Sequence, residues 1–497
     1  MRGFCLALVC LLSLGLMLLP APALGDETPV LRALIVTCDR FLSGEDTTPA
    51  AQINAQMMRE ALEADARGYA VIRTESDTVS SAQMLKDIVD ETFADAKAGD
   101  ISLIYLSTHG VYNPARSNRT ACLLLSDGET EGRLYAGALE AMVHAVPGTH
   151  LIIMDACNSG AMIGKGLSDP ADLVALNADT DHVLCSAGGS EQSWYWRSDT
   201  DGNSTLYGAG YFTSILARGL SAQAGYPADE DGDGTVTMGE AAAYLREHYA
   251  VSTPQVYPER DGQTVLFRCG PAEEGLTGFY DVEFEETVFS AGADAIRFSF
   301  ELGSPTDIAY HLVYMKNGQW DFANAQQFSE PASLAPGSYE RTLRLNLPDE
   351  DLTASGYIML QVFVLNGGRP VLAESRLISV LPQTGDVALS VTSPSVFYAA
   401  GGAELPVTVR HDIPCVINVR VQNVRGETVR NLAFDLSTRP QRLVPEGTCL
   451  YWDGLTERGA PADSGYYIIR VATEIGQSSY TAYSMPFRLV RSDEAEG

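Results

Sequence analysis

Short apolar runs alternate with amphipathic segments from residue 31 to about residue 269. Such runs are typical of strands buried on both faces, and the segments between them repeat apolar residues at helical spacing. The predicted strands are LRALIVTC, YAVIRT, ISLIYLS, LIIMDA and HVLCSA, and the predicted helices span residues 50–67, 80–97 and 134–146. This alternation predicts an α/β domain with a mostly parallel sheet between two helical layers. Ligands in this architecture bind at the carboxyl ends of the strands.

A different pattern begins after residue 270. Runs such as IRFSFEL, YIMLQVFVL, VINVRVQNV and YYIIRVATE alternate or stay apolar between turns rich in Gly, Pro, Asn and Asp. Regular spacing of this kind predicts two antiparallel β-sandwiches, which we place at residues 278–381 and 385–490. The acidic tail 491–497 is expected to be loose.

Length and charge narrow the function classes. The chain has 497 residues, more than one hydrophobic core normally holds, and about three domains are expected. A formal net charge of −31 argues against extended contact with nucleic acid or an anionic bilayer, since both need basic surface. Calcium, cationic ligands and basic substrates fit this charge better.

The N-terminus reads MRGFCLALVCLLSLGLMLLPAPALG, with one early positive charge, an apolar stretch and the small-residue sequence Ala21-Pro22-Ala23. This pattern predicts a cleaved signal peptide over residues 1–25. The alternative is an uncleaved anchor, for which the apolar stretch is short. We therefore expect a secreted or extracytoplasmic protein with no transmembrane segment after signal cleavage.

Seven cysteines follow the predicted signal peptide, and an odd number in an exported chain leaves at least one thiol unpaired. Cys415 and Cys449 fall in the same β-rich region. They are expected either to form a disulfide or to be two buried free cysteines.

Cys157 follows the apolar run LIIMDA, and His109 follows ISLIYLS in the sequence STHG. Parallel strands bring their carboxyl ends to one edge, so the thiol and the imidazole are expected to meet there. A thiolate can attack a carbonyl while the imidazole moves the proton, and the N–H groups of Gly110 and Cys157 are candidates for an oxyanion hole. The other six histidines are expected before strands, within helices or in the sandwiches: His144, His150, His182, His248, His311 and His411.

The pair of motifs STHG and DACNSG, with 48 residues from His109 to Cys157, resembles the caspase-like cysteine peptidases, which include caspases, metacaspases, legumains, clostripain and gingipains. The resemblance covers residues 31–269 and implies a cysteine-type endopeptidase. It implies that His109 and Cys157 form the catalytic dyad and that Gly110 contributes to the oxyanion hole. Asp155 stands where caspases have a glutamine, as in metacaspases, so cleavage after aspartate is not expected.

Asp155 and Cys157 are two residues apart in an extended segment, so their side chains should point the same way. The carboxylate could then receive a lysine or arginine side chain at P1. Alternatively, it caps the following turn or orients a loop. The segment SAGGSEQSWYWRSD resembles the substrate loop of legumain, which would place Ser193 and Asp199 near the same pocket.

The sequence ADEDGDGTVTMGEAAAYL has the spacing of an EF-hand loop. Three alternating carboxylates, one carbonyl and a carboxylate from the next helix are the expected calcium ligands: Asp229, Asp231, Asp233, Thr235 and Glu240. Hard oxygen ligands at this spacing favour Ca²⁺. The alternative is an acidic surface turn that binds no ion.

The segment LYWDGLTERGAPADSGYYIIRVATE resembles the immunoglobulin-like module of flagellar hook-capping proteins. This implies a spacer or docking surface without catalysis. The expected fold is therefore a caspase-like α/β three-layer sandwich followed by two all-β immunoglobulin-like sandwiches.

The predicted function is that of an exported cysteine-type endopeptidase that cleaves protein or peptide substrates, with a basic P1 preference and a calcium-binding loop. The two sandwiches are expected to contact a cell surface or another protein. The alternative is a catalytically inactive caspase-like scaffold in an adhesion or surface-binding protein.

Overall fold

The computed structural model describes residues 28–42, 50–113, 120–167, 176–199, 206–259, 261–271, 279–285, 288–290, 295–316, 319–345, 356–366, 369–381, 387–399, 402–413, 415–438, 446–475 and 478–491. The predicted signal peptide and the acidic tail after residue 491 lie outside these residues. Within them, no helix is long and apolar enough to cross a membrane.

A six-stranded sheet forms the centre of the N-terminal half, in the order β12-β8-β7-β3-β1-β2. Neighbouring strands are parallel except for β12, which runs antiparallel to β8. The strands are β1 (Leu31–Thr37), β2 (Tyr69–Ser76), β3 (Ile101–Ser107), β7 (Thr149–Asp155), β8 (Asp181–Cys185) and β12 (Gln255–Tyr257).

Alternate residues of the central strands enter two separate hydrophobic clusters, one on each face of the sheet. Ile104 and Ile152 belong to one cluster, whereas Leu103 and Leu151 belong to the other. The helices that complete the two clusters are α1 (Ala50–Glu63), α4 (Tyr211–Gly219) and α5 (Met238–His248) on one face, and α2 (Ala82–Thr92) and α3 (Ala136–His144) on the other. The predicted α/β domain with three layers is therefore present, and its sheet is mixed but mostly parallel.

The predicted helices are longer than the observed ones, and at the start of α3 the reason is that the neighbouring segment pairs as a strand. Residues 134 and 135 belong to a strand that pairs with residues 122 and 123, so α3 begins only at Ala136. This strand is part of a three-stranded sheet that the hydrophobic pattern did not predict: β4 (Gly110–Val111), β5 (Cys122–Ser126) and β6 (Glu131–Tyr135).

The middle β region, residues 279–381, contains two sheets that enclose one hydrophobic core. Among its described strands, all pairs are antiparallel except β15 with β21. One sheet is β14 (Phe279–Phe284), β16 (Ala295–Leu302) and β19 (Gly337–Arg344), and the other is β15 (Val288–Ser290), β21 (Arg369–Leu381), β20 (Gly356–Asn366), β17 (Asp307–Lys316) and β18 (Gln319–Ser329).

The C-terminal β region, residues 389–491, repeats this arrangement around a core of its own. Its one parallel pair among the described strands is β23 with β30. One sheet contains β22 (Leu389–Thr392), β24 (Leu405–His411) and β27 (Thr448–Trp452), and the other contains β23 (Val396–Ala399), β30 (Phe487–Arg491), β28 (Gly465–Ile475), β25 (Cys415–Asn423), β26 (Thr428–Thr438) and β29 (Ser478–Tyr483).

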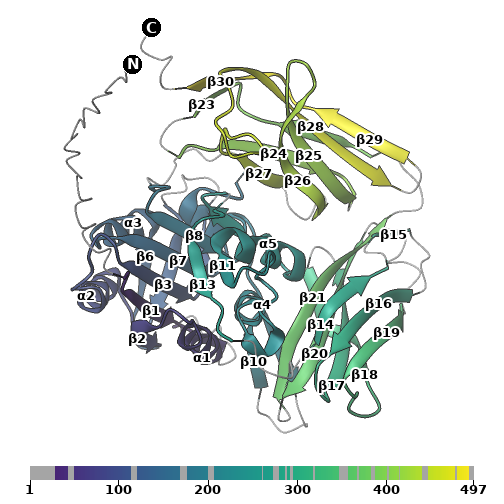
Figure 1. Ribbon diagram of the computed structural model, residues 1–497. Helices are drawn as coiled ribbons and strands as arrows, with labels where there is room; N and C mark the ends of the chain where they lie inside the picture. The colour runs from purple at the N-terminus through teal and green to yellow at the C-terminus, as the bar shows by residue number, and fades with distance from the viewer. Residues whose placement is uncertain are drawn as a thin grey trace, which may run out of the picture.

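Both β regions pack against the α/β domain, as Figure 1 shows. The middle β region shares one hydrophobic cluster with α1, α4 and α5, to which it contributes residues such as Trp320 and Phe363. Tyr357 of the same region also donates a hydrogen bond to the Thr438 carbonyl of the C-terminal β region. The three parts of the chain are therefore in mutual contact.

All seven cysteines of the described chain are free. The Cys415 sulfur lies 3.8 Å from the Thr438 hydroxyl, whereas the Cys449 thiol donates to the Leu167 carbonyl at 3.5 Å. Of the two alternatives for this pair, the structure has the buried free cysteines.

Candidate active site

The register of the central sheet brings His109 and Cys157 to the same edge. Ser107, the last residue of β3, pairs with Asp155, the last residue of β7. His109 and Cys157 each follow two residues later, and the Thr108 N–H donates to the Asp155 carbonyl at 3.1 Å. The two segments therefore leave the sheet side by side.

Gly110 lies directly against the backbone of Cys157. A Cβ atom at Gly110 would be 1.7 Å from the Cys157 carbonyl oxygen, a separation that no side chain could adopt. Only glycine permits the chain after His109 to approach the cysteine so closely. The close approach brings the imidazole segment and the thiol segment into backbone contact.

Two contacts hold His109 in place, one through its backbone and one through its ring. The Leu124 N–H donates to the His109 carbonyl at 2.8 Å, which joins the segment to the β4-β5-β6 sheet. The His109 ring also packs against the buried Phe41 ring, with centroids 4.6 Å apart.

Cys157 begins a turn that the sequence CNSG makes possible. Asn158 adopts the left-handed conformation at φ +56°, and a 3₁₀ helix follows as η2 (Ser159–Ile163). Asparagine tolerates this conformation better than most residues do. The turn ends the β7 strand and leaves Cys157 partly buried at the sheet edge.

The Cys157 thiol donates a hydrogen bond to the Ser193 carbonyl at 3.5 Å. Burial raises the pKa of this thiol, and the nearby Asp155 carboxylate raises it further. The thiol is therefore protonated at neutral pH in this conformation. Attack on a carbonyl would need a base to remove the proton.

Asp155 is buried beneath Cys157, with 5% of its surface exposed. Ser193 Oγ donates to its Oδ1 at 2.7 Å, and Thr213 Oγ1 donates to its Oδ2 at 2.6 Å. Burial raises the pKa of Asp155, while these hydroxyl donors lower it in part. The carboxylate lies near enough to the thiol to raise its pKa, and it also holds Ser193 through a hydrogen bond.

Asp39 is a second acid at this edge, and the hydrophobic pattern did not point to it. It follows β1, which pairs with β3 so that Thr37 lies opposite Ser107. Its carboxylate accepts a hydrogen bond from the Ala51 N–H at the start of α1. Burial raises the pKa of Asp39 to about 6. Asp39 follows β1, which ends at the same carboxyl edge of the sheet as β3 and β7, and this position is the signal that could have identified it.

Ser193 and Asp199 differ in their distance from the thiol. Ser193 contacts both Asp155 and Cys157, as described above. Asp199 is the last residue of β9 (Tyr195–Asp199), where it pairs with Leu206 of β10 (Leu206–Gly210). The length of β9 thus separates Asp199 from Ser193.

The predicted calcium loop brings three carboxylates together. One ligand atom from each of Asp229, Asp231 and Asp233 lies within 4.8 Å of the others. Asp229 also accepts the N–H groups of Asp233 and Gly234, and Gly234 has φ +85°. These contacts turn the loop so that its acids point to one centre.

Glu240 is placed differently from the three aspartates. Its carboxylate accepts the N–H and hydroxyl of Thr237 at 2.8 Å each, in a capping box at the start of α5. Thr235 belongs to β11 (Thr235–Thr237), which pairs with β13 (Val265–Arg268), and its N–H donates to Asp233 at 2.8 Å. The aspartates therefore fit a cation, whereas Glu240 would have to rotate away from the helix cap to ligate it.

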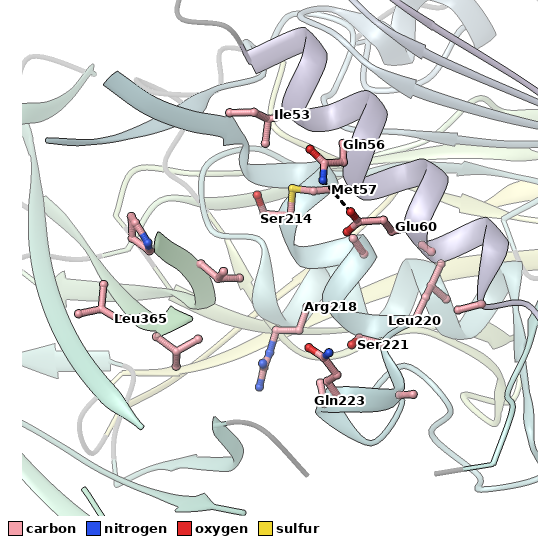
Figure 2. Close-up of a pocket in the computed structure, with 18 of the residues that line it drawn as sticks. Ile53, Gln56, Met57, Glu60, Ser214, Arg218, Leu220, Ser221, Gln223 and Leu365 are labelled. Carbon is pink, nitrogen blue, oxygen red and sulfur yellow. Dashed lines mark hydrogen bonds between the residues drawn. The ribbon is translucent and has the colours of Figure 1, made fainter. Parts of the chain in front are cut away.

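A cavity of about 500 Å³ lies between the α/β domain and the middle β region. Figure 2 shows Gln56 and Glu60 of α1 and Arg218 of α4 on its wall, with Leu365 of β20 opposite. Neither His109 nor Cys157 lines it. The cavity is thus a feature of the domain interface, separate from the thiol.

Residues 31–226 match the family model of the caspase domain, Peptidase_C14. These residues form a caspase-like domain. The match confirms the caspase-like resemblance based on STHG and DACNSG, and the caspase-domain family comprises cysteine peptidases. It ends before the predicted calcium loop and both β regions.

No curated protein matches the chain. Among solved structures, the chain is similar to the crystal structure of protein GSU0716 from Geobacter sulfurreducens at 16% sequence identity. The likeness covers 49% of this chain and 100% of that one, with a TM-score of 0.33. A likeness at this level has no bearing on function.

Proposed function

We propose that the protein is a cysteine-type endopeptidase whose catalytic dyad is Cys157 and His109. The observation that supports this most is the contact of Gly110 with the Cys157 carbonyl at the carboxyl edge of the sheet. It brings a thiol and an imidazole from separate strands into adjoining backbone segments.

In the proposed mechanism, His109 takes the thiol proton as the sulfur attacks the scissile carbonyl carbon. The resulting tetrahedral oxyanion accepts hydrogen bonds from the N–H groups of Gly110 and Cys157. Collapse of this intermediate breaks the C–N bond, and the imidazolium protonates the leaving amine. Water then hydrolyses the thioester, with His109 again as the base.

The proposed specificity is for lysine or arginine at P1. Asp155 lies close to the thiol and accepts hydrogen bonds from Ser193 and Thr213, and Asp39 follows the neighbouring strand β1, so two buried acids stand at this edge of the sheet. A cationic P1 side chain would be attracted to these two acids. The Ser193 hydroxyl, which donates to Asp155, would be a further polar contact for this side chain.

Calcium binding by the 229–240 loop is a separate proposal. Three converging carboxylates suit a hard cation, and the two glycines at positive φ, Gly232 and Gly234, permit the loop to close around it. When bound, Ca²⁺ would neutralise the repulsion among the aspartates and join β11 more firmly to α5.

Export and surface attachment complete the proposal. The N-terminal sequence supports secretion or an extracytoplasmic location, and the two β regions would serve as immunoglobulin-like modules that contact a cell surface or a protein partner. The exposed aromatic residues Tyr398, Phe434, Tyr466 and Tyr483 of the C-terminal β region are compatible with such contacts.

A peptide-library cleavage profile of the purified chain, with and without Ca²⁺, tests the proposal. Cleavage after Arg and Lys is expected. Cleavage after other residues only would reject the acidic pocket while leaving the dyad intact. Absence of cleavage in every library would favour the inactive scaffold.

A further inference from the structure

The segment after the proposed nucleophile is interwoven with the loop that carries Ser193. We call residues 157–167 the nucleophile loop and residues 187–194 the substrate loop. Gly160 donates its N–H to the Ala187 carbonyl at 2.9 Å, and Gly189 donates to the Lys165 carbonyl at 3.1 Å. The Asn158 N–H donates to the Glu191 carbonyl at 2.8 Å. A shift of either loop therefore moves the other.

Close packing makes this connection rigid. A Cβ atom at Gly160 would lie 2.8 Å from the Ala187 carbonyl oxygen, and one at Gly166 would lie 2.5 Å from Gly188 Cα. The two loops thus touch through bare backbone. Close packing of this kind transmits a shift of one loop to the other.

Side chains of the C-terminal β region contact the end of the nucleophile loop. Lys165 Nζ, on a side chain only 3% exposed, pairs with Glu404 at 2.7 Å and with Glu259 at 3.0 Å. The ammonium also lies 4.3 Å from the centroid of the Tyr451 ring. Glu404 and Tyr451 belong to the C-terminal β region, whereas Glu259 follows β12 of the α/β domain.

Two further contacts bind the next residues of the loop. The Gly166 N–H donates to the Tyr451 hydroxyl at 2.8 Å, and the Cys449 thiol donates to the Leu167 carbonyl. Three consecutive residues of the nucleophile loop are thus held by a part of the chain that is remote in sequence. A buried ammonium needs such partners, since burial alone would disfavour its charge.

We propose that the C-terminal β region positions the nucleophile. Through Glu404 and Tyr451 it holds Lys165 and Gly166, and the backbone contacts of these residues with the substrate loop fix the setting of Cys157. Lys165 is a positioning residue, because it acts through the loop and does not touch substrate. The kinetic part of this inference rests on the proposed peptidase activity.

The test uses the full chain with Glu404→Gln and Tyr451→Phe. Glu404→Gln removes the negative charge beside Lys165, and Tyr451→Phe removes the hydroxyl that accepts the Gly166 N–H. Lys165 keeps Glu259 and the Val256 carbonyl as partners in both variants. Glu427→Gln is the matched control, since Glu427 is exposed and pairs with Arg425 within the same β region.

Amide hydrogen exchange, read by mass spectrometry, gives the first readout. Peptides covering residues 158–167 and 187–193 are expected to exchange about tenfold faster in Glu404→Gln and Tyr451→Phe than in the control. The second readout is hydrolysis, where kcat is expected to fall about tenfold while KM changes less than about twofold, because a misplaced nucleophile slows chemistry more than binding.

Wild-type exchange in both loops of both variants would overturn the proposal, and so would normal kcat despite faster exchange. If the wild-type chain hydrolyses no peptide, the proposed function fails, but the exchange experiment still decides whether the C-terminal β region holds the loop.

Discussion

Ser193 contacts Cys157 and Asp155 at the same time. Its carbonyl accepts a hydrogen bond from the Cys157 thiol at 3.5 Å, and its hydroxyl donates a hydrogen bond to the Asp155 carboxylate at 2.7 Å. A substrate that places its carbonyl at the sulfur and its P1 side chain at Asp155 must displace both contacts. In the proposed mechanism, part of the substrate's binding energy would be spent on replacing these two contacts.

Asp155→Asn tests the acidic pocket. The amide keeps the size of the carboxylate but removes its charge, so kcat/KM for an Arg-P1 peptide is expected to fall about 10- to 100-fold, in line with about 1.5–3 kcal/mol for a charged hydrogen bond. Asp87→Asn, on the exposed face of α2, is the control. Equal losses for Arg-P1 and neutral-P1 peptides would show that Asp155 only orients the loop.

Gly110→Ala tests the close approach of the two segments. The added methyl would meet the Cys157 carbonyl oxygen, so the backbone must separate, and kcat is expected to fall by about 100-fold or more. The control is Gly137→Ala on α3, where an added Cβ meets nothing within 4 Å and should slightly stabilise the helix. Activity of Gly110→Ala equal to that of the control would show that the segments do not cooperate.

Much of the site could be predicted from sequence because it depends on strand ends. The apolar runs before His109 and Cys157 stop at the carboxyl edge of the sheet, and parallel pairing of the two strands brings their ends together. Asp39 could not be assigned in the same way, because its position near His109 depends on β1 lying next to β3. The pattern of apolar residues does not predict the order of strands in a sheet. The contact of Lys165 with Glu404 joins segments far apart in the chain, and only tertiary packing determines it.

The calcium loop and the helices show a second limit of the sequence pattern. Spacing predicted five ligands, but Glu240 caps α5, because a carboxylate at the third helical position can also satisfy backbone N–H groups at the helix start.

The length of α3 was overestimated because strand pairing competes for the same residues in β6.

Asp39 predicts an acidic limb in the pH profile. Its pKa of about 6 means that the carboxylate becomes protonated as the pH falls below 6, which removes a negative charge from the pocket. For Arg-P1 peptides, kcat/KM is expected to decline below about pH 6, and Asp39→Asn should flatten this decline. A neutral-P1 peptide is the control. An unchanged acidic limb in the variant would assign it to another group.

Protonation of Asp39 is expected to have opposite effects on stability and on activity. Because the folded pKa of Asp39 lies above its ordinary value of 3.8, folding favours the protonated acid, and that contribution is lost as the pH rises through about 6. Asp39→Asn is therefore expected to raise the melting temperature at pH 8 relative to wild type, and to have less effect at pH 4. Thermal denaturation at the two pH values checks this.

Calcium should stabilise the α/β domain. At about 100 times the Kd, a ligand that binds only the folded state adds about 2.7 kcal/mol, which corresponds to a melting temperature several degrees higher. Chelation is expected to reverse the rise, and Asp231→Asn should weaken it, whereas Asp87→Asn should not. No thermal response to Ca²⁺ in the metal-free wild-type chain would exclude this loop as a calcium site.

The role of Cys157 as the nucleophile is tested most directly by hydrolysis of an Arg-P1 fluorogenic peptide by the purified chain and by Cys157→Ala, with Cys185→Ala as the matched control. Cys185 is a buried free cysteine at the end of a neighbouring strand. The account predicts that wild type and Cys185→Ala hydrolyse the peptide and that Cys157→Ala does not. Hydrolysis by Cys157→Ala at the wild-type rate would contradict it.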